Sequence, residues 1–184
     1  MVEKFSTTQE IMTQSRRLVV SLLINPKYLF QSYMHSSLAS RVLLKNNLVV
    51  SSSTDGAVKV WDMEKHEQLW ELDHEDKVWD AVLRDNQLIT CCEDMSVRIL
   101  DLLSGNQLHR LEHPGACVNC DLSPNKSLLA VACSCAVVLW NLKTIVKIKQ
   151  FELGSVINDV RFSPSGDRLI VGLQDGEIFK IDMN

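Results

Sequence analysis

Cysteine and histidine are the residue types in this chain that offer metal or redox chemistry. The 184 residues include six cysteines and five histidines. Cys117 and Cys120 have the CxxC spacing of half a zinc site, and Cys133 and Cys135 follow shortly after. The competing interpretation is that the cysteines are small buried core residues. The N-terminus, MVEKFSTTQE, does not resemble a signal peptide, so the cysteines indicate a reducing compartment.

Histidine and aspartate recur at a fixed spacing, which bears on whether they act as acids and bases. His35 precedes Asp55 by 20 residues, and His74 precedes Asp94 by 20 as well. One repeated hydrogen bond explains such pairs better than several independent general bases do. The chain also lacks a nucleophile with a partner base, a phosphate-binding glycine-rich loop and an HExxH motif. We therefore expect no enzyme, no catalytic residue, no cofactor and no metal site.

The elements that carry these residues repeat along the chain. An apolar pentad ending in an acid or amide occurs four times, as VKVWD at Asp62, VRILD at Asp101, VVLWN at Asn141 and IFKID at Asp182. Successive pentads end 39, 40 and 41 residues apart. A period of this length with Trp-Asp at its end is the signature of a propeller blade.

Residues 73–101 show the content of one unit. Short runs rich in Val, Ile, Leu and Thr at 78–83, 88–92 and 97–101 are separated by turn residues, and a fourth run follows around 107–111. This spacing of strands and turns is typical of an all-β protein.

Over roughly residues 34–184 the units resemble the WD40 family. In many members a His, a Ser or Thr, an Asp and a Trp form a hydrogen-bonded set within each blade, and the resemblance implies such a set here. The first unit offers all four, the second has Leu100 in place of Trp, the third has Ser134 in place of Asp, and the fourth keeps only Asp. The matching residues are His35, Ser51 or Ser53, Asp55 and Trp61; His74, Thr90 and Asp94; His113 and Trp140; and Asp175.

The same resemblance bears on the cysteines and on stability. It places Cys117 and Cys120 three residues apart on an inner strand, where side chains should point to opposite faces and cannot chelate one ion. It also implies that Asp94 matters less for stability than Asp55, because Leu100 offers no indole donor.

The resemblance further predicts an incomplete ring. We expect a flexible segment at residues 1–15 and a WD40 domain at 16–184, with a partial N-terminal blade at 16–34, about four blades, and no outer strand in the last unit. The usual seven-bladed ring would need more strands, so an open arc or a fragment of a larger ring is predicted. The alternative is that a second copy of the chain completes the ring through exposed blade edges.

Composition indicates which classes of binding partner and which cellular location to expect. A formal net charge of −4 argues against a nucleic-acid-binding surface. The longest candidate for a membrane-spanning run, residues 18–24, is far too short to cross a membrane. We expect a cytoplasmic or nuclear scaffold or adaptor that presents blade loops to proteins or peptides. A specific alternative is the substrate-binding propeller of an F-box/WD ubiquitin-ligase receptor, suggested by the segment NNLVVSSSTDGAVKVWD at 46–62, although residues 1–33 contain no F-box helix.

The candidate partner-binding face is acidic. In a WD propeller the loops between blades and the turns between second and third strands lie on one face. Here they contribute seven acids besides the blade aspartates, with Lys77 as the only base, so a basic peptide should be attracted. These acids are Asp73, Glu75, Asp76, Glu93, Glu112, Glu152 and Glu177.

Overall fold

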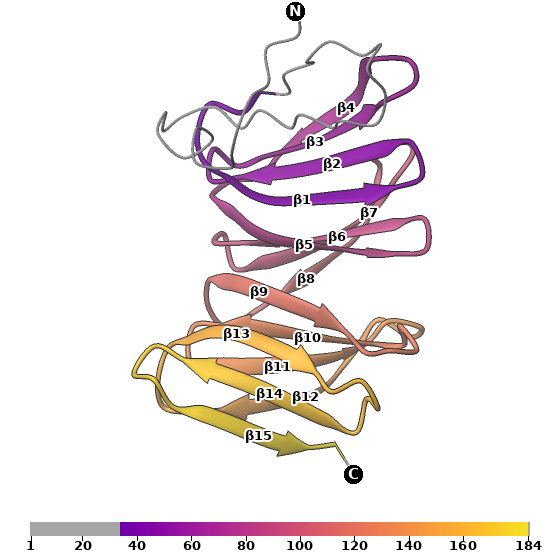
Figure 1. The fold of residues 1–184 in the computed structure, drawn as a ribbon. Helices are drawn as coiled ribbons and strands as arrows, with labels where there is room; N and C mark the ends of the chain where they lie inside the picture. Colours follow the sequence, from indigo (N-terminus) through magenta and orange to yellow (C-terminus); the bar gives the residue numbers. More distant parts are fainter. Residues whose placement is uncertain (1–33, 184) are drawn as a thin grey trace, which may run out of the picture.

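The computed structural model describes residues 34–183. The secondary-structure elements in that part of the chain are all β-strands (Figure 1). The segment at 1–15 and the strands expected at 16–33 lie outside the described residues. No described helix is long and apolar enough to cross a membrane.

The strands form four antiparallel sheets, here called blades 1 to 4, in each of which consecutive strands are neighbours. Blade 1 contains β1 (Ala39–Lys45), β2 (Leu48–Ser53), β3 (Ala57–Asp62) and β4 (Glu67–Asp73). Blade 2 contains β5 (Val78–Arg84), β6 (Gln87–Cys92), β7 (Ser96–Asp101) and β8 (Gln107–Glu112). Blade 3 contains β9 (Cys117–Leu122), β10 (Leu128–Cys133), β11 (Ala136–Asn141) and β12 (Val146–Glu152). Blade 4 contains β13 (Ile157–Phe162), β14 (Arg168–Leu173) and β15 (Ile178–Asp182).

The acid or amide at the end of each pentad closes the third strand with a side-chain turn. Asp62 Oδ1 accepts a hydrogen bond from the backbone N–H of Glu64 at 2.9 Å. Asp101 and Asn141 occupy the same position in the next two blades and accept from the second following residue at 3.2 and 2.9 Å. A short polar side chain that satisfies its own backbone favours a turn over further strand. The repeated pentad ending thus sets where each third strand stops.

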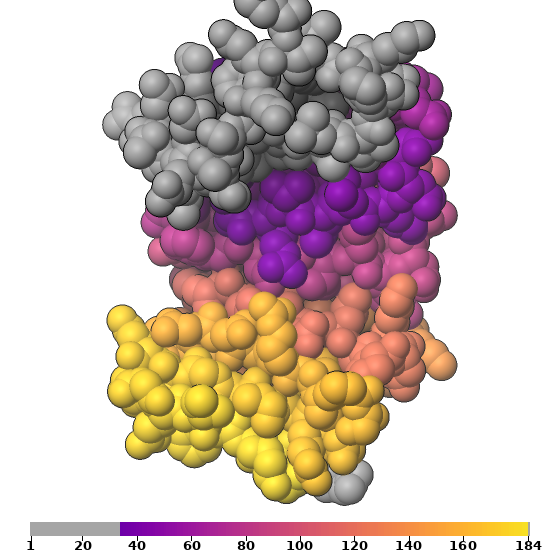
Figure 2. Space-filling view, in the orientation of Figure 1, coloured from indigo at the N-terminus to yellow at the C-terminus, as the bar shows by residue number. Residues whose placement is uncertain are grey.

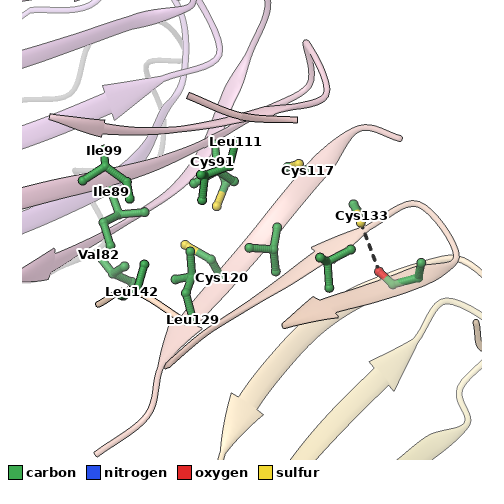
Figure 3. Close-up of a cluster of buried hydrophobic side chains, with 14 residues drawn as sticks. Val82, Ile89, Cys91, Ile99, Leu111, Cys117, Cys120, Leu129, Cys133 and Leu142 are labelled. Atoms are coloured by element: carbon green, nitrogen blue, oxygen red, sulfur yellow. Dashed lines mark hydrogen bonds between the residues drawn. The ribbon is translucent and has the colours of Figure 1, made fainter. Parts of the chain in front are cut away.

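The hydrophobic core lies between blades rather than inside them. Three clusters of buried side chains occupy the three successive blade interfaces. Figure 3 shows the middle one, where Ile89 and Ile99 of blade 2 face Leu129 of blade 3. The second strands of blades 1 to 3 are almost fully buried, whereas β8 and β12 are mostly exposed. Each blade therefore depends on its neighbours for stability.

The blades form an open arc, as predicted. They follow one another in chain order from indigo to yellow, and the first strands β1, β5, β9 and β13 lie next to one another along the arc (Figure 1). Within residues 34–183, no strand pairing connects blade 1 to blade 4, and β15 has no outer partner.

Candidate functional site

The candidate site is the face formed by the loops between blades and the turns between second and third strands, here called the loop face. Backbone hydrogen bonds join these segments: Glu93 N–H donates to Lys77 O at 2.8 Å, and Gln174 N–H donates to Val156 O at 2.8 Å. The loops and turns therefore form one connected surface. The buried blade histidines and the aspartates Asp55 and Asp94 lie directly beneath it.

In blade 1 the structure brings three of the four expected side chains into contact. His35 Nε2 lies 2.8 Å from Ser51 Oγ, and His35 Nδ1 lies 3.4 Å from Asp55 Oδ1. Ser53, the alternative to Ser51, accepts a hydrogen bond from the backbone N–H of Asp55 at 3.1 Å instead. Trp61 is partly buried on β3 of the same blade.

Asp55 ties the loop before blade 1 to the turn between β2 and β3. It accepts hydrogen bonds from the backbone N–H groups of Ser36 at 2.7 Å and Ala57 at 3.0 Å. Burial alone would raise the pKa of this carboxyl, but the hydrogen bonds from Ala57, Ser53 and Ser36 outweigh burial and lower it. Asp55 is therefore ionised and serves as a structural acceptor.

In blade 2 an arginine side chain binds the equivalent aspartate, Asp94. Thr90 Oγ1 lies 3.1 Å from His74 Nε2, while Arg98 Nη2 lies 3.2 Å from Asp94 Oδ2. The Arg98 and Asp94 side chains are only 8% and 4% exposed. Arg98 pairs across from Thr90, as Lys59 does from Ser51 in blade 1. The expectation that blade 2 holds Asp94 weakly because Leu100 replaces Trp therefore missed this buried ion pair.

Blades 3 and 4 keep less of the set. In blade 3, Trp140 Nε1 donates directly to His113 Nε2 at 3.0 Å, and His113 Nδ1 lies 3.0 Å from the carbonyl of Leu111. Ser134 lies in the turn between β10 and β11. In blade 4, Asp175 accepts a hydrogen bond from the backbone N–H of Glu177 at 3.0 Å in an exposed turn.

The buried histidines are neutral. Burial lowers the pKa of His74 to about 4, with a further contribution from the Arg98 guanidinium. Burial also lowers the pKa of His113 to about 4 and outweighs its bond to the Leu111 carbonyl. His113 bonds through both ring nitrogens and His74 through Nε2, and both rings are buried within their blades.

Five of the six cysteines are buried, and Cys135 is half-buried in the turn between β10 and β11. Cys117 and Cys120 belong to the same buried cluster, together with Cys91 and Cys133 (Figure 3). The expectation that they point to opposite faces was wrong, because Cys117 pairs with Cys133 while Asn119 pairs with Ala132, which marks a bulge between them. Burial raises the pKa of the Cys91 and Cys117 thiols and that of Cys133 to about 12.

Among the described residues, one group has ligand atoms close enough for a metal ion: His74, Cys92 and Asp94, within 4.8 Å of one another. Burial raises the pKa of Cys92 to about 12, which disfavours the thiolate that a metal would need. The Arg98 guanidinium already places a positive charge against Asp94. The group therefore fits a structural role better than a metal centre.

A small hollow of about 130 Å³ lies on the opposite face, between the turns after β9 and β13. Its lining contains no titratable side chain and consists of Ser123, Pro124, Asn125, Leu128, Ser165 and Gly166. It offers no group for acid–base or nucleophilic chemistry.

The acidic loop face holds more positive charge than the loops alone suggest. Arg110, on β8, lies 3.3 Å from Glu75 and 2.8 Å from Glu112, and Lys77 lies 2.9 Å from Glu93. Counting Lys77 as the only base was therefore wrong, since strand residues also reach this face. Four of the seven predicted acids form no ion pair with a described residue: Asp73, Asp76, Glu152 and Glu177.

Trp79 is the functional candidate that the sequence reasoning missed. It is 39% exposed at the start of β5, and its Nε1–H donates to Glu93 Oε2 at 3.1 Å. Lys77 Nζ lies 5.9 Å from the centre of its ring. Met95 and Val156, in loop-face segments, are 51% and 42% exposed. The sequence did contain a sign of this role. The equivalent position in blades 1 and 3 is Ser40 and Val118, so the repeat itself does not require a tryptophan there.

Comparison with known proteins agrees with this geometry. The family model described as "WD domain, G-beta repeat" matches residues 36–62 and 147–182. The WD40 β-propeller domain of Doa1 superposes with a TM-score of 0.73 at 20% identity, over 83% of this chain and 53% of that chain. These comparisons support the WD40-repeat family of β-propeller proteins for this chain.

Curated relatives are similar at low identity. The U3 small nucleolar RNA-associated protein 21 homolog of Schizosaccharomyces pombe is 26% identical over 79% of this chain and 17% of its own length. The WD repeat-containing protein 89 homolog of Dictyostelium discoideum is 27% identical over 74% of this chain and 39% of its own length. The chain thus spans less than half of either relative. The F-box/WD alternative gains no support from these relatives.

Proposed function

We propose that the chain is a non-catalytic protein-interaction module that presents its loop face to a basic segment of a partner protein. The family supports the general role, since WD repeats form rigid platforms that display loops. The observation that carries the specific proposal is the exposed Trp79, beside Glu93 and on a face where four acids form no ion pair with a described residue.

Trp79 and Glu93 together are suited to a cation. The face of an indole attracts lysine and arginine, and a carboxylate next to it adds an ion pair. Lys77 already occupies this arrangement, 5.9 Å from the ring centre and 2.9 Å from Glu93. Because the Lys77 side chain is 45% exposed, an incoming arginine or lysine can displace it at little cost.

The test is binding of labelled peptides of equal length that are lysine- and arginine-rich, neutral or acidic. We expect only the basic peptides to bind, and more weakly as salt is raised. Trp79→Ala should weaken binding at least tenfold, whereas Lys77→Ala should strengthen it by removing the internal competitor. Asp85→Asn, in an exposed turn of the opposite face, is the matched control. Equal binding of acidic peptides, or no effect of Trp79→Ala, would contradict the proposal.

Location and excluded partners belong to the same proposal. A cytoplasmic or nuclear protein that binds neither nucleic acid nor membrane fits the net charge of −4 and the protein-binding role. The name of the nucleolar relative from Schizosaccharomyces pombe is compatible with the nucleus.

A further inference from the structure

Every blade joins the loop before its first strand to the turn between its second and third strands by the same hydrogen bond. A backbone N–H of the turn donates to a carbonyl of the loop at 2.8–3.0 Å. The four pairs, turn residue first, are Thr54 with Leu38, Glu93 with Lys77, Ser134 with Ala116 and Gln174 with Val156. Of the four described blades, blade 2 alone has charged side chains at both positions, so the repeat does not require them.

The Glu93 carboxylate is held by its own blade through one of its two oxygens. Trp79 Nε1–H donates to Oε2 at 3.1 Å, and Lys77 Nζ donates to the same oxygen at 2.9 Å. No described residue donates to Oε1, and the Glu93 side chain is 32% exposed. Blade 2 lies between blades 1 and 3 (Figure 2), so described blades border this site on both sides. One carboxylate oxygen is therefore available to a ligand.

Lys77 uses only part of what this site offers to a cation. Its ammonium pairs with Glu93 Oε2 but lies 5.9 Å from the centre of the Trp79 ring. That distance is at the outer limit of about 6 Å for attraction between a cation and an aromatic face. A compact ammonium also cannot bind both carboxylate oxygens in the parallel way that a planar group can.

A partner's lysine would gain little at this site. It would displace Lys77 and form with Glu93 the same kind of ion pair that Lys77 loses. The net change in contacts is then close to zero, whichever lysine occupies the site. The other acids of the loop face, such as Asp76, attract any basic residue and do not distinguish lysine from arginine.

A partner's arginine would form two contacts that Lys77 does not. A guanidinium binds both oxygens of a carboxylate through two parallel N–H···O bonds, and its plane stacks on an aromatic ring. At this site it can donate to Oε1 and Oε2 of Glu93 while it covers the exposed part of the Trp79 indole. Displacing Lys77 is therefore a net gain for arginine.

We propose that Trp79 and Glu93 form an arginine-selective anchor, so that the loop face recognises a partner segment by an arginine rather than by its total positive charge. This inference rests on the proposed function, because it concerns the same site. Lys77 lowers the affinity for every basic ligand by the same factor, since it competes with each of them for Glu93. The preference for arginine over lysine therefore depends on Trp79 and Glu93 and not on Lys77.

The test is binding of two peptides of equal length and charge, whose basic residues are either all arginine or all lysine. We expect the wild-type chain to bind the arginine peptide at least tenfold more tightly. Glu93→Gln and Trp79→Ala should each reduce this ratio below about threefold without changing the circular dichroism spectrum. Lys77→Ala should strengthen both peptides equally and keep the ratio. Glu152→Gln, which removes an exposed acid elsewhere on the loop face, is the matched control and should also keep it.

The outcomes separate this inference from the proposed function. Equal binding of the two peptides to the wild type would overturn the arginine anchor and leave a basic-segment-binding face. A ratio that persists in both Glu93→Gln and Trp79→Ala would also overturn it, because the preference would then arise elsewhere. Binding of neither peptide would overturn the proposed function and the inference together.

Discussion

At the scale of single residues, blades 1 and 2 hold equivalent aspartates in different ways. Asp55 is bound by hydrogen bonds and His35, whereas Asp94 is bound by Ser96 and by the buried Arg98 guanidinium. Removing one member of a buried ion pair leaves an uncompensated charge, which costs more than losing neutral hydrogen bonds. The ion pair therefore makes blade 2 the more sensitive of the two.

We predict that Asp94→Ala lowers the free energy of unfolding by about 3–5 kcal/mol. Asp55→Ala should cost about 1–3 kcal/mol, because the groups that it leaves unpaired are mostly neutral donors. Urea denaturation of the two variants gives the comparison. A smaller loss for Asp94→Ala than for Asp55→Ala would show that Arg98 does not depend on Asp94.

The buried histidines predict a pH dependence. Because burial lowers the pKa of His74 and His113 to about 4, the unfolded chain, with an ordinary pKa near 6.5, binds more protons between these values. Stability should therefore fall as pH drops from about 6.5 to 4, by about 3 kcal/mol for each histidine. His113→Gln should reduce this slope, measured by urea denaturation at several pH values. An unchanged slope in His113→Gln would exclude His113 as a source.

At the scale of elements, the bulged first strands join the blades through Asp80. Its carboxylate is 4% exposed and lies between Arg41 and Asn119 of the two neighbouring blades. Burial raises the pKa of this group, which shows that desolvation outweighs its donors. One side chain thus links three blades.

Asp80→Ala should lower the free energy of unfolding by about 3 kcal/mol, because it leaves Asn119, the Cys120 N–H and Arg41 without their acceptor. Asp159→Ala removes the same residue type from the same position in blade 4, where it is half exposed, and should cost less than about 1 kcal/mol. Thermal or urea unfolding distinguishes the two. Similar losses in both variants would mean that the interblade contacts of Asp80 add nothing.

Much of this level of structure could be predicted from the sequence. The pentads ending at Asp62 and Asp101 fixed the third strands, since each ending also forms a turn. The bulge before Asn119 could not be predicted, because no local residue preference marks it, and so the orientation of Cys117 was misjudged. The Arg98–Asp94 pair was missed for a similar reason, as it depends on how far a long side chain reaches across a strand.

At the scale of the whole molecule, the loop face and the opposite face of the arc differ in composition. The opposite face carries short turns, and the loop face combines the exposed Trp79 with acids that form no ion pair with a described residue. Blade cores hold the loops in place, because the aspartates beneath the loop face bind loop backbone, as Asp55 binds Ser36. A rigid face of this kind binds without reorganisation cost.

The most direct test of the central claim is a hydrogen–deuterium exchange map of the chain with and without a saturating lysine- and arginine-rich peptide. We predict protection of residues 74–79 and 93–95, around Trp79 and Glu93, and no change in the opposite-face turns at 85–86 and 124–126. Protection confined to those opposite turns, or no protection around Trp79 at saturation, would contradict the assignment of the loop face as the binding surface.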